Sequence, residues 1–242
     1  MQRVISRALI VSALASLLGL PSFQVNAQRT WDLPPGVKTM LVNNYEMAYI
    51  ERGTGPVLVL VHGVMNDYRI WGGQIGPLGA RFRVIAVSLR HYFPEKWNGN
   101  GDDLSVGQHA SDMAAFIKGL NSGPVHLLGH SRGGAVAAEV AKTNPELLRS
   151  LVLADPALND LIPQAESTVG VRATLRSRFE AGDMEGGLEA YTDAIGGEGS
   201  WKTSPEPFRR MLRDNAWTAT ESSSQPPFSC PAGPYMRCQH SF

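Results

Sequence analysis

The chain has 242 residues, of which 43% are hydrophobic and 18% are charged, and it holds 22 basic and 22 acidic residues. These values are typical of one globular domain with a modest additional layer. They exclude the basic surface expected of a protein that binds nucleic acid. We find no internal repeat, no spacing typical of metal ligands and no phosphate-cradling loop, so we predict neither a metal nor a cofactor.

The first residues have the pattern of a secretory signal peptide. Arg3 and Arg7 precede the uncharged segment 8–20, and Ala27 offers a small residue at the cleavage position. The apolar segment is too short to cross a bilayer, and an uncleaved anchor is the alternative interpretation. We predict a signal peptide at 1–27 and an exported product, periplasmic or secreted, without a stable membrane anchor. The predicted signal peptide contains two basic residues and no acidic residue, so the chain that remains after cleavage has a net charge of −2.

Residues 28–156 alternate predicted strands with predicted helices. A hairpin with strands at 37–42 and 45–50 turns at two asparagines, and a helix with Ser105 as its N-cap carries an apolar stripe. The remaining elements are strands at 57–61, 82–87, 124–128 and 151–153, a short helix near 71–79 and a helix over 134–141. This alternation predicts a mostly parallel sheet with helices on both faces and functional groups at the carboxyl ends of its strands.

Residues 129–133 read G-H-S-R-G between a predicted strand and a predicted helix, with Ser131 at the apex of the turn. Such a turn drives the apex residue toward positive φ, and the flanking glycines let strand and helix approach closely. The start of the helix offers a free N–H and a positive dipole end to a developing oxyanion. We therefore predict that Ser131 is a nucleophile; the alternative is a glycine-rich loop with an incidental serine.

A second motif, His62-Gly63, follows the buried strand at 57–61. Together with the G-x-S-x-G turn, it resembles the α/β-hydrolase family over residues 37–156. The resemblance implies that the loop after the third strand supplies one oxyanion-hole N–H, which is that of Val64 here. The N–H of Arg132, directly after the nucleophile, would be the second donor. We expect His62 to orient this loop rather than to act as a catalyst.

The pattern turns helical after the sixth strand, and in the family such inserted helices form a cap, which we place at 157–217. Its expected apolar stripes are Val171, Leu175 and Phe179; Leu188, Tyr191 and Ile195; and Phe208, Met211 and Leu212, with Ser204 capping the last helix and Pro205 at its first position. We interpret these stripes as packing and assign no binding residue among them. The loop 88–103 either rims the active site, as in related hydrolases, or is a solvated connection.

The segment 218–242 does not continue this pattern. No Leu, Ile or Val follows Leu212, and the segment holds four Pro, five Ser and both cysteines. Such a composition cannot supply central strands, so we expect the sheet to lack the last two strands of the family fold. Either the gene is truncated or frame-shifted, leaving an irregular tail of non-native sequence, or the protein is a natural non-catalytic variant. Cys230 and Cys238 either close a small disulfide loop or are accidental.

The missing strands bear on the mechanism, because a serine nucleophile needs a base and an acid that orients the base. None of the six histidines occupies the base position that the family implies: His62, His91, His109, His126, His130 and His240. Asp155, after the sixth strand, is either an alternative acid or part of an ordinary turn.

We therefore expect a hydrolase that uses Ser131 through an acyl-enzyme on a small ester-like substrate, impaired by the missing histidine. A serine at this position argues against epoxide hydrolase or dehalogenase activity, for which the family uses a carboxylate nucleophile. The alternative is a catalytically silent ligand-binding protein with the same fold. Its oligomeric state does not follow from the sequence.

Overall fold

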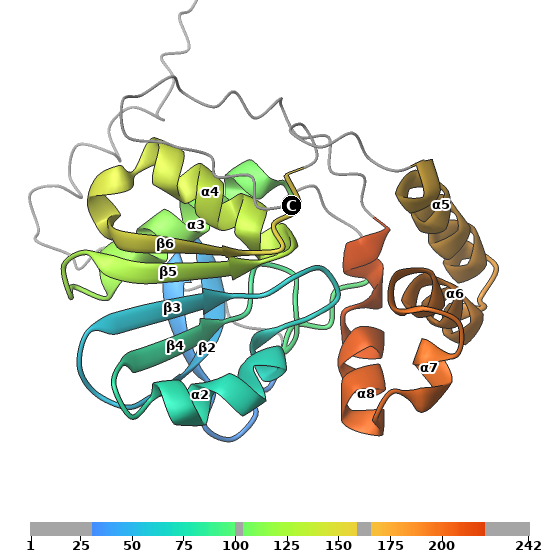
Figure 1. Cartoon of the computed structure of the whole chain (residues 1–242), viewed down its shortest axis with the longest axis horizontal. Coiled ribbons are helices and arrows are strands. Elements are labelled where there is room, and N and C mark those ends of the chain that lie inside the picture. Colours follow the sequence, from blue (N-terminus) through green and yellow to red (C-terminus); the bar gives the residue numbers. More distant parts are fainter. Residues whose placement is uncertain (1–30, 100–103, 159–165, 221–242) are drawn as a thin grey trace, which may run out of the picture.

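The computed structural model of the chain describes residues 31–99, 104–158 and 166–220 (Figure 1). Three sequence predictions fall outside the described residues: the signal peptide at 1–27, the possible disulfide between the two cysteines, and the position of His240. Most of the segment 218–242 lies outside them as well.

The described residues form one six-stranded sheet with the strand order β1-β2-β4-β3-β5-β6. β1 and β2 form an antiparallel hairpin and β2 pairs antiparallel with β4, whereas β4, β3, β5 and β6 run parallel. This confirms the predicted fold class, and within the described ranges the sheet ends at β6. The strands are β1 (Lys38–Val42), β2 (Tyr45–Arg52), β3 (Val57–Val61), β4 (Arg83–Val87), β5 (Val125–His130) and β6 (Leu148–Ala154).

Local sequence signals account for several element boundaries. Asn43 and Asn44 connect β1 to β2 with φ angles of 46° and 61°, the left-handed conformation that a two-residue hairpin turn requires and asparagine tolerates. Ser105 caps α3 (Val106–Gly119) by accepting a hydrogen bond from the N–H of Gln108 at 3.0 Å. Both features were predicted from the sequence.

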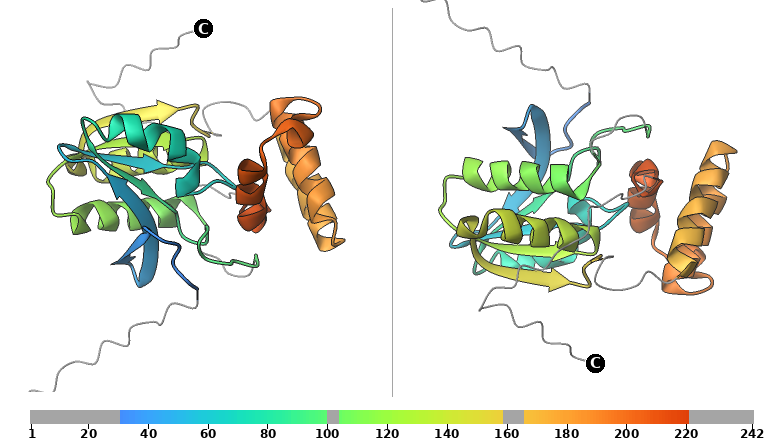
Figure 2. Two further views of the ribbon diagram at one scale, coloured as in Figure 1. Left: turned by 90° about the horizontal axis from the view of Figure 1, so that it is seen from below. Right: turned by 90° about the horizontal axis from the view of Figure 1, so that it is seen from above.

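Helices cover both faces of the sheet (Figures 1 and 2). On one face, α3 and α4 (Arg132–Thr143) pack on alternate strand residues such as Val59, Ile85 and Leu127. On the other face, the 3₁₀ turn η3 (Tyr68–Trp71) and α2 (Gly72–Leu78) pack near Leu60. Within the ranges that the structure describes, none of the helices combines the length and the apolarity that a bilayer span needs.

A second helical layer lies beyond the carboxyl ends of the parallel strands (Figure 1). It consists of α5 (Glu166–Glu180), α6 (Met184–Gly196), α7 (Ser200–Thr203), α8 (Glu206–Asp214) and the 3₁₀ turn η5 (Ala216–Ala219). Leu175, Leu188, Trp201 and Leu212 form its core, and Met65 from the loop after β3 packs among them. The cap therefore shares its core with a loop of the sheet domain.

Three expectations for the cap are corrected. Ser204 is not the N-cap of α8: its hydroxyl donates to the carbonyl oxygen of Ser200 at 2.7 Å, so it closes α7, and Pro205 occupies the capping position. Ile195 does not belong to the buried stripe of α6, since it is 66% exposed. The helical structure of the cap also extends beyond its predicted end at residue 217, because η5 continues to Ala219, which is buried in the cap core.

Among the described residues β6 has no neighbouring strand on its outer side, and it exposes apolar side chains, with Val152 47% and Leu153 37% accessible. An edge strand with such residues is a template for pairing with another chain. We expect the protein to self-associate as its concentration rises, and V152K to reduce this association in sedimentation velocity. I195K serves as the control, because it removes an even more exposed apolar side chain, 66% accessible, that lies on α6 away from the sheet. Equal association of V152K and the unchanged protein would contradict the prediction.

Candidate active site

Ser131 stands at a sharp bend between β5 and α4. Its φ and ψ angles are 50° and −120°, a conformation that L-residues rarely adopt and that costs about 1–3 kcal/mol unless the surroundings enforce it. Two glycines of the motif make the bend possible. A Cβ at Gly129 would lie 2.2 Å from the carbonyl oxygen of Gly133, and one at Gly133 would lie 2.4 Å from that of His62. The predicted strand–turn–helix context of Ser131 is therefore present.

The turn after β6 holds the bend in place. The N–H of Ser131 donates to the carbonyl oxygen of Ala154 at 3.1 Å, and the N–H of Ala157 donates to the carbonyl oxygen of Ser131 at 2.9 Å. Asp155 lies in this turn with a φ of 45° and an exposed side chain. In the structure, the Asp155-Pro156 turn thus holds Ser131 in place through its backbone.

The loop after β3 lies against the other side of Ser131. Gly63 leaves so little space that a Cβ there would be 3.1 Å from the Ser131 Cβ. Val64 follows and lines the same cavity as Ser131. Among the described residues, no acceptor engages the backbone N–H of Val64 or that of Arg132, the first residue of α4. The two N–H groups predicted as oxyanion donors therefore have no acceptor among the described residues, and they lie on either side of Ser131.

His62 is fully buried and both of its ring nitrogens are engaged. The N–H of Leu89 donates to Nε2 at 3.0 Å, so Nδ1 carries the proton and donates to the carbonyl oxygen of Gly63 at 2.8 Å. The ring also packs edge-on against Tyr92. His62 thereby orients the loop that carries Val64 and has no nitrogen left to act as a base.

Burial lowers the pKa of His62 from 6.5 to about 4, although its hydrogen bond to Gly63 opposes the shift. The unfolded chain therefore binds the proton first, and the stability that the neutral ring contributes at neutral pH is lost as the pH falls from about 6.5 to 4. We expect about 3 kcal/mol of unfolding free energy to disappear over this range. H62Q should show a smaller loss in urea unfolding at pH 7 and pH 4.5. An equal loss in the variant would contradict this assignment.

None of the other histidines in the described part of the chain hydrogen-bonds to the Ser131 hydroxyl. His91 is paired with Glu95 at 3.0 Å, His109 is buried beside the Arg90 carbonyl, and His126 near the start of β5 contacts Ser150 at 2.7 Å. His130 lines the cavity with Ser131, but no hydrogen bond joins the two side chains. The described structure thus brings the serine and the two amides together without a histidine partner.

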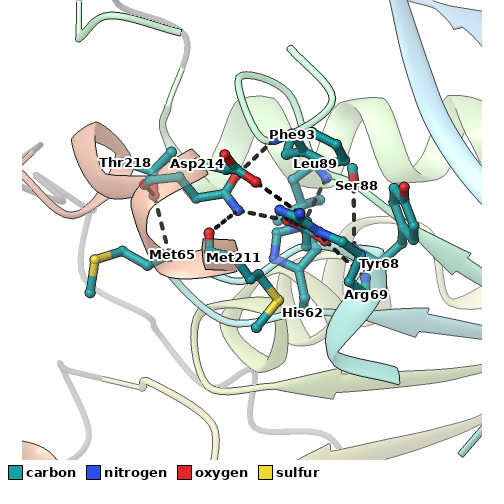
Figure 3. A network of polar contacts seen from close by, with 12 residues as sticks. His62, Met65, Tyr68, Arg69, Ser88, Leu89, Phe93, Met211, Asp214 and Thr218 are labelled. Atoms are coloured by element: carbon teal, nitrogen blue, oxygen red, sulfur yellow. Dashed lines mark hydrogen bonds and ion pairs between the residues drawn. The ribbon is translucent and has the colours of Figure 1, made fainter. Parts of the chain in front are cut away.

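A polar network that the sequence did not predict ties the loop after β3 to the cap (Figure 3). The buried carboxylate of Asp67 accepts hydrogen bonds from the Arg69 guanidinium and, at 2.7 Å, from the side-chain amide of Asn215. Arg69 also contacts Asp214 at 2.8 Å, and the N–H of Met65 donates to the Thr218 hydroxyl at 3.3 Å. The network fixes the loop that carries Val64.

The loop after β4 joins the same network. The N–H of Phe93 donates to the Asn215 side-chain oxygen at 2.7 Å, and Leu89 and Tyr92 are almost fully buried. Residues 88–94 of this segment are therefore buried or half-buried next to the cap, whereas Lys96 and Asn98 are exposed. Residues 100–103 lie outside the described ranges.

A cavity of about 390 Å³ opens beside Ser131, between the sheet and the cap. Residues of the loop after β3 and of the bend at Ser131 form its floor, and α6, α7 and α8 form its walls. The lining is Val64, Met65, Asn66, His130, Ser131, Tyr191, Thr192, Ile195, Gly196, Ser200, Ser204, Phe208 and Leu212. The exposed Ile195 stands at this cavity, so part of the predicted packing stripe lines the site. No group of side chains that could hold a metal ion occurs among the described residues.

Comparisons with known proteins agree with this architecture. Uncharacterized proteins of Mycobacterium tuberculosis and Mycobacterium bovis are each 33% identical over 124 residues, which is 50% of this chain and 35% of theirs. The chain thus matches about a third of the length of these relatives. A solved hydrolase from Pseudomonas aeruginosa has a TM-score of 0.60 at 16% identity, covering 78% of this chain and 72% of that one. E-2-(acetamidomethylene)succinate hydrolase has a TM-score of 0.55 at 23% identity, covering 76% and 70%.

At 16% and 23% identity, these two solved structures show that this chain shares their fold. The model of the alpha/beta hydrolase family matches residues 58–239, which is more than half of the chain and reaches into the segment after 217. The sheet order, the glycine-flanked bend at Ser131 and this match agree, and the chain belongs to the alpha/beta hydrolase family.

Proposed function

We propose that this chain is a serine hydrolase that acts through an acyl-enzyme on a small ester-like substrate. The observation that carries the proposal is the conformation of Ser131, which is held at a φ of 50° on a glycine-flanked bend and lines a cavity. A side chain presented in this way can attack a carbonyl carbon bound in that cavity.

The proposed oxyanion donors are the backbone N–H groups of Val64 and Arg132. Attack converts the carbonyl oxygen into an oxyanion, and preorganised donors stabilise this charge by about 3–4 kcal/mol each. Both amides lack an acceptor among the described residues, and Arg132 begins a 12-residue helix whose dipole adds to the positive potential. The apolar wall of Tyr191, Phe208 and Leu212 suits an apolar portion of the substrate.

We further propose that turnover by this chain is impaired. Proton removal from a serine hydroxyl requires a base within hydrogen-bond reach, and among the described residues no histidine contacts Ser131. The deletion of such a base lowers turnover by up to about six orders of magnitude and leaves the contribution of the oxyanion hole. The competing proposal is a catalytically silent protein that binds a ligand in the same cavity.

Ester hydrolysis separates the two proposals. We expect slow release of p-nitrophenol from p-nitrophenyl butyrate, above the rate in buffer, and its loss in S131A. S177A is the matched control, since Ser177 is exposed on α5 away from the cavity. Equal rates for the unchanged protein and S131A, with an unchanged circular-dichroism spectrum, would favour the silent binding protein.

Export is a separate proposal that depends on residues outside the described ranges. We propose that the chain is exported and acts in the periplasm or as a secreted protein. Sequencing the N-terminus of protein recovered from the exported fraction should find Gln28 as the first residue. Recovery of the protein with residues 1–27 attached would contradict it.

A further inference from the structure

A second cavity, of about 470 Å³, lies between α8, the 3₁₀ turn η3 and the loop after β4. Aromatic and apolar side chains form most of its lining, among them Tyr68 and Phe93. Its two charged residues are Arg69, which forms ion pairs with two aspartates at 2.6 and 2.8 Å, and Arg210, which is exposed. The proposed reaction does not use this cavity.

Phe208 belongs to both cavities. Of the described residues, it alone lines the second cavity and the cavity beside Ser131. Residues three and four positions apart lie on the same side of a helix. Leu212, four residues after Phe208, lines the cavity beside Ser131, whereas Met211, three residues after it, lines the second cavity. Phe208 therefore stands at the boundary between the two cavities.

Hydrogen bonds at both ends of α8 hold this boundary in place. The N–H of Phe208 donates to the carbonyl oxygen of Pro205 at 3.0 Å. After the last turn, the side-chain amide of Asn215 donates to the carbonyl oxygen of Met211 at 2.9 Å and to the buried carboxylate of Asp67 at 2.7 Å, within the network of Figure 3. Because the helix is fixed at both ends, Phe208 is a wall that does not yield easily.

The cavity beside Ser131 suits an uncharged chain. None of the described residues that line it is Asp, Glu, Lys or Arg, and a charge buried there would have no partner of opposite sign. When an ester carbonyl lies at Ser131 on the floor of the cavity, an apolar chain attached to it extends toward the walls, where Phe208 and Leu212 lie.

We propose that Phe208 determines how long the acyl chain of the substrate can be. Its side chain closes the cavity beside Ser131 toward the second cavity, so short acyl chains fit and longer ones do not. A small residue at this position joins the two cavities and admits a longer chain. The inference rests on the proposed function and names its substrate class, esters of short, uncharged carboxylic acids.

Binding tests the inference without any chemistry. Isothermal titration of S131A with methyl butyrate and with methyl octanoate compares two esters that differ by four methylene groups, each of which contributes about fourfold to affinity when it is buried. In S131A we expect the octanoate to bind no more tightly than the butyrate. In S131A/F208A we expect it to bind at least about tenfold more tightly than the butyrate, because its chain continues into the second cavity.

P207A is the matched control. Pro207 is exposed on the same helix and lines the second cavity only, so S131A/P207A should show the pattern of S131A. F208L keeps an apolar side chain in the cap, so it tests the inference even where F208A does not fold, and it should show an intermediate gain for the octanoate. The same ratio of affinities in S131A and in every folded Phe208 variant would overturn the proposal, and so would a tighter binding of the octanoate by S131A itself.

The two proposals fail separately. A limit on chain length that moves with Phe208, combined with ester hydrolysis that does not depend on Ser131, would remove the serine mechanism and keep the role of Phe208. Hydrolysis that depends on Ser131, combined with affinities that do not respond to Phe208, would keep the mechanism and remove this boundary.

Discussion

Added imidazole is expected to raise the rate of ester hydrolysis by this chain about tenfold or more, and only when Ser131 is present. Among the described residues no histidine hydrogen-bonds to the Ser131 hydroxyl, so the proposed mechanism lacks a positioned base, a group that contributes about 10²–10⁴-fold. Imidazole from solution can take the serine proton in its place. The measurement is the initial rate of p-nitrophenol release against imidazole concentration at pH 7.5.

The control for this experiment is S131A, in which imidazole should add only its own background hydrolysis. Without imidazole, the rate should continue to rise with pH through the range where a catalytic histidine would produce a plateau. A plateau near pH 7, together with indifference to imidazole, would show that the chain already holds a base.

Replacement of Asp67 by alanine is expected to destabilise the protein by about 3–5 kcal/mol. The Asp67 carboxylate is fully buried and accepts from the Arg69 guanidinium and from Asn215, so D67A leaves both donors without their main acceptor. The measurement is the unfolding free energy in urea. Ser131-dependent hydrolysis should fall as well, because the loop with Val64 loses its anchor to the cap.

The matched control is D214A. Asp214 contacts the same guanidinium at 2.8 Å, but its side chain is 30% exposed, so its loss should cost at most about 1 kcal/mol. If D67A and D214A lost the same small amount of stability, the buried network would not be what holds the loop to the cap.

The sequence predicted the parts of the fold that local patterns determine. Short apolar runs predicted the strands, paired asparagines marked the β1–β2 turn, and Ser105 marked the start of α3. The motif around Ser131 predicted its strained bend, because the glycines at 129 and 133 are needed for close backbone contacts that any Cβ would block. These features depend on neighbours in the chain and so can be read from it.

The sequence did not predict the contacts that join distant segments. Asp67 and Asn215 are 148 residues apart, and neither belongs to a motif that would suggest their hydrogen bond. The prediction that Ser204 caps α8 was wrong because a serine before a proline also suits the end of a preceding helical turn. The exposure of Ile195 depends on where α6 lies relative to the sheet, which helical periodicity does not specify.

The central claim is that Ser131 is the nucleophile, and locating a covalent adduct tests it most directly. After incubation with a fluorophosphonate, tandem mass spectrometry of the digested protein should find the phosphonyl group on Ser131 and on no other serine of the cavity. An adduct confined to Ser200 or Ser204, or no adduct on folded protein after prolonged incubation at pH 8, would contradict the account.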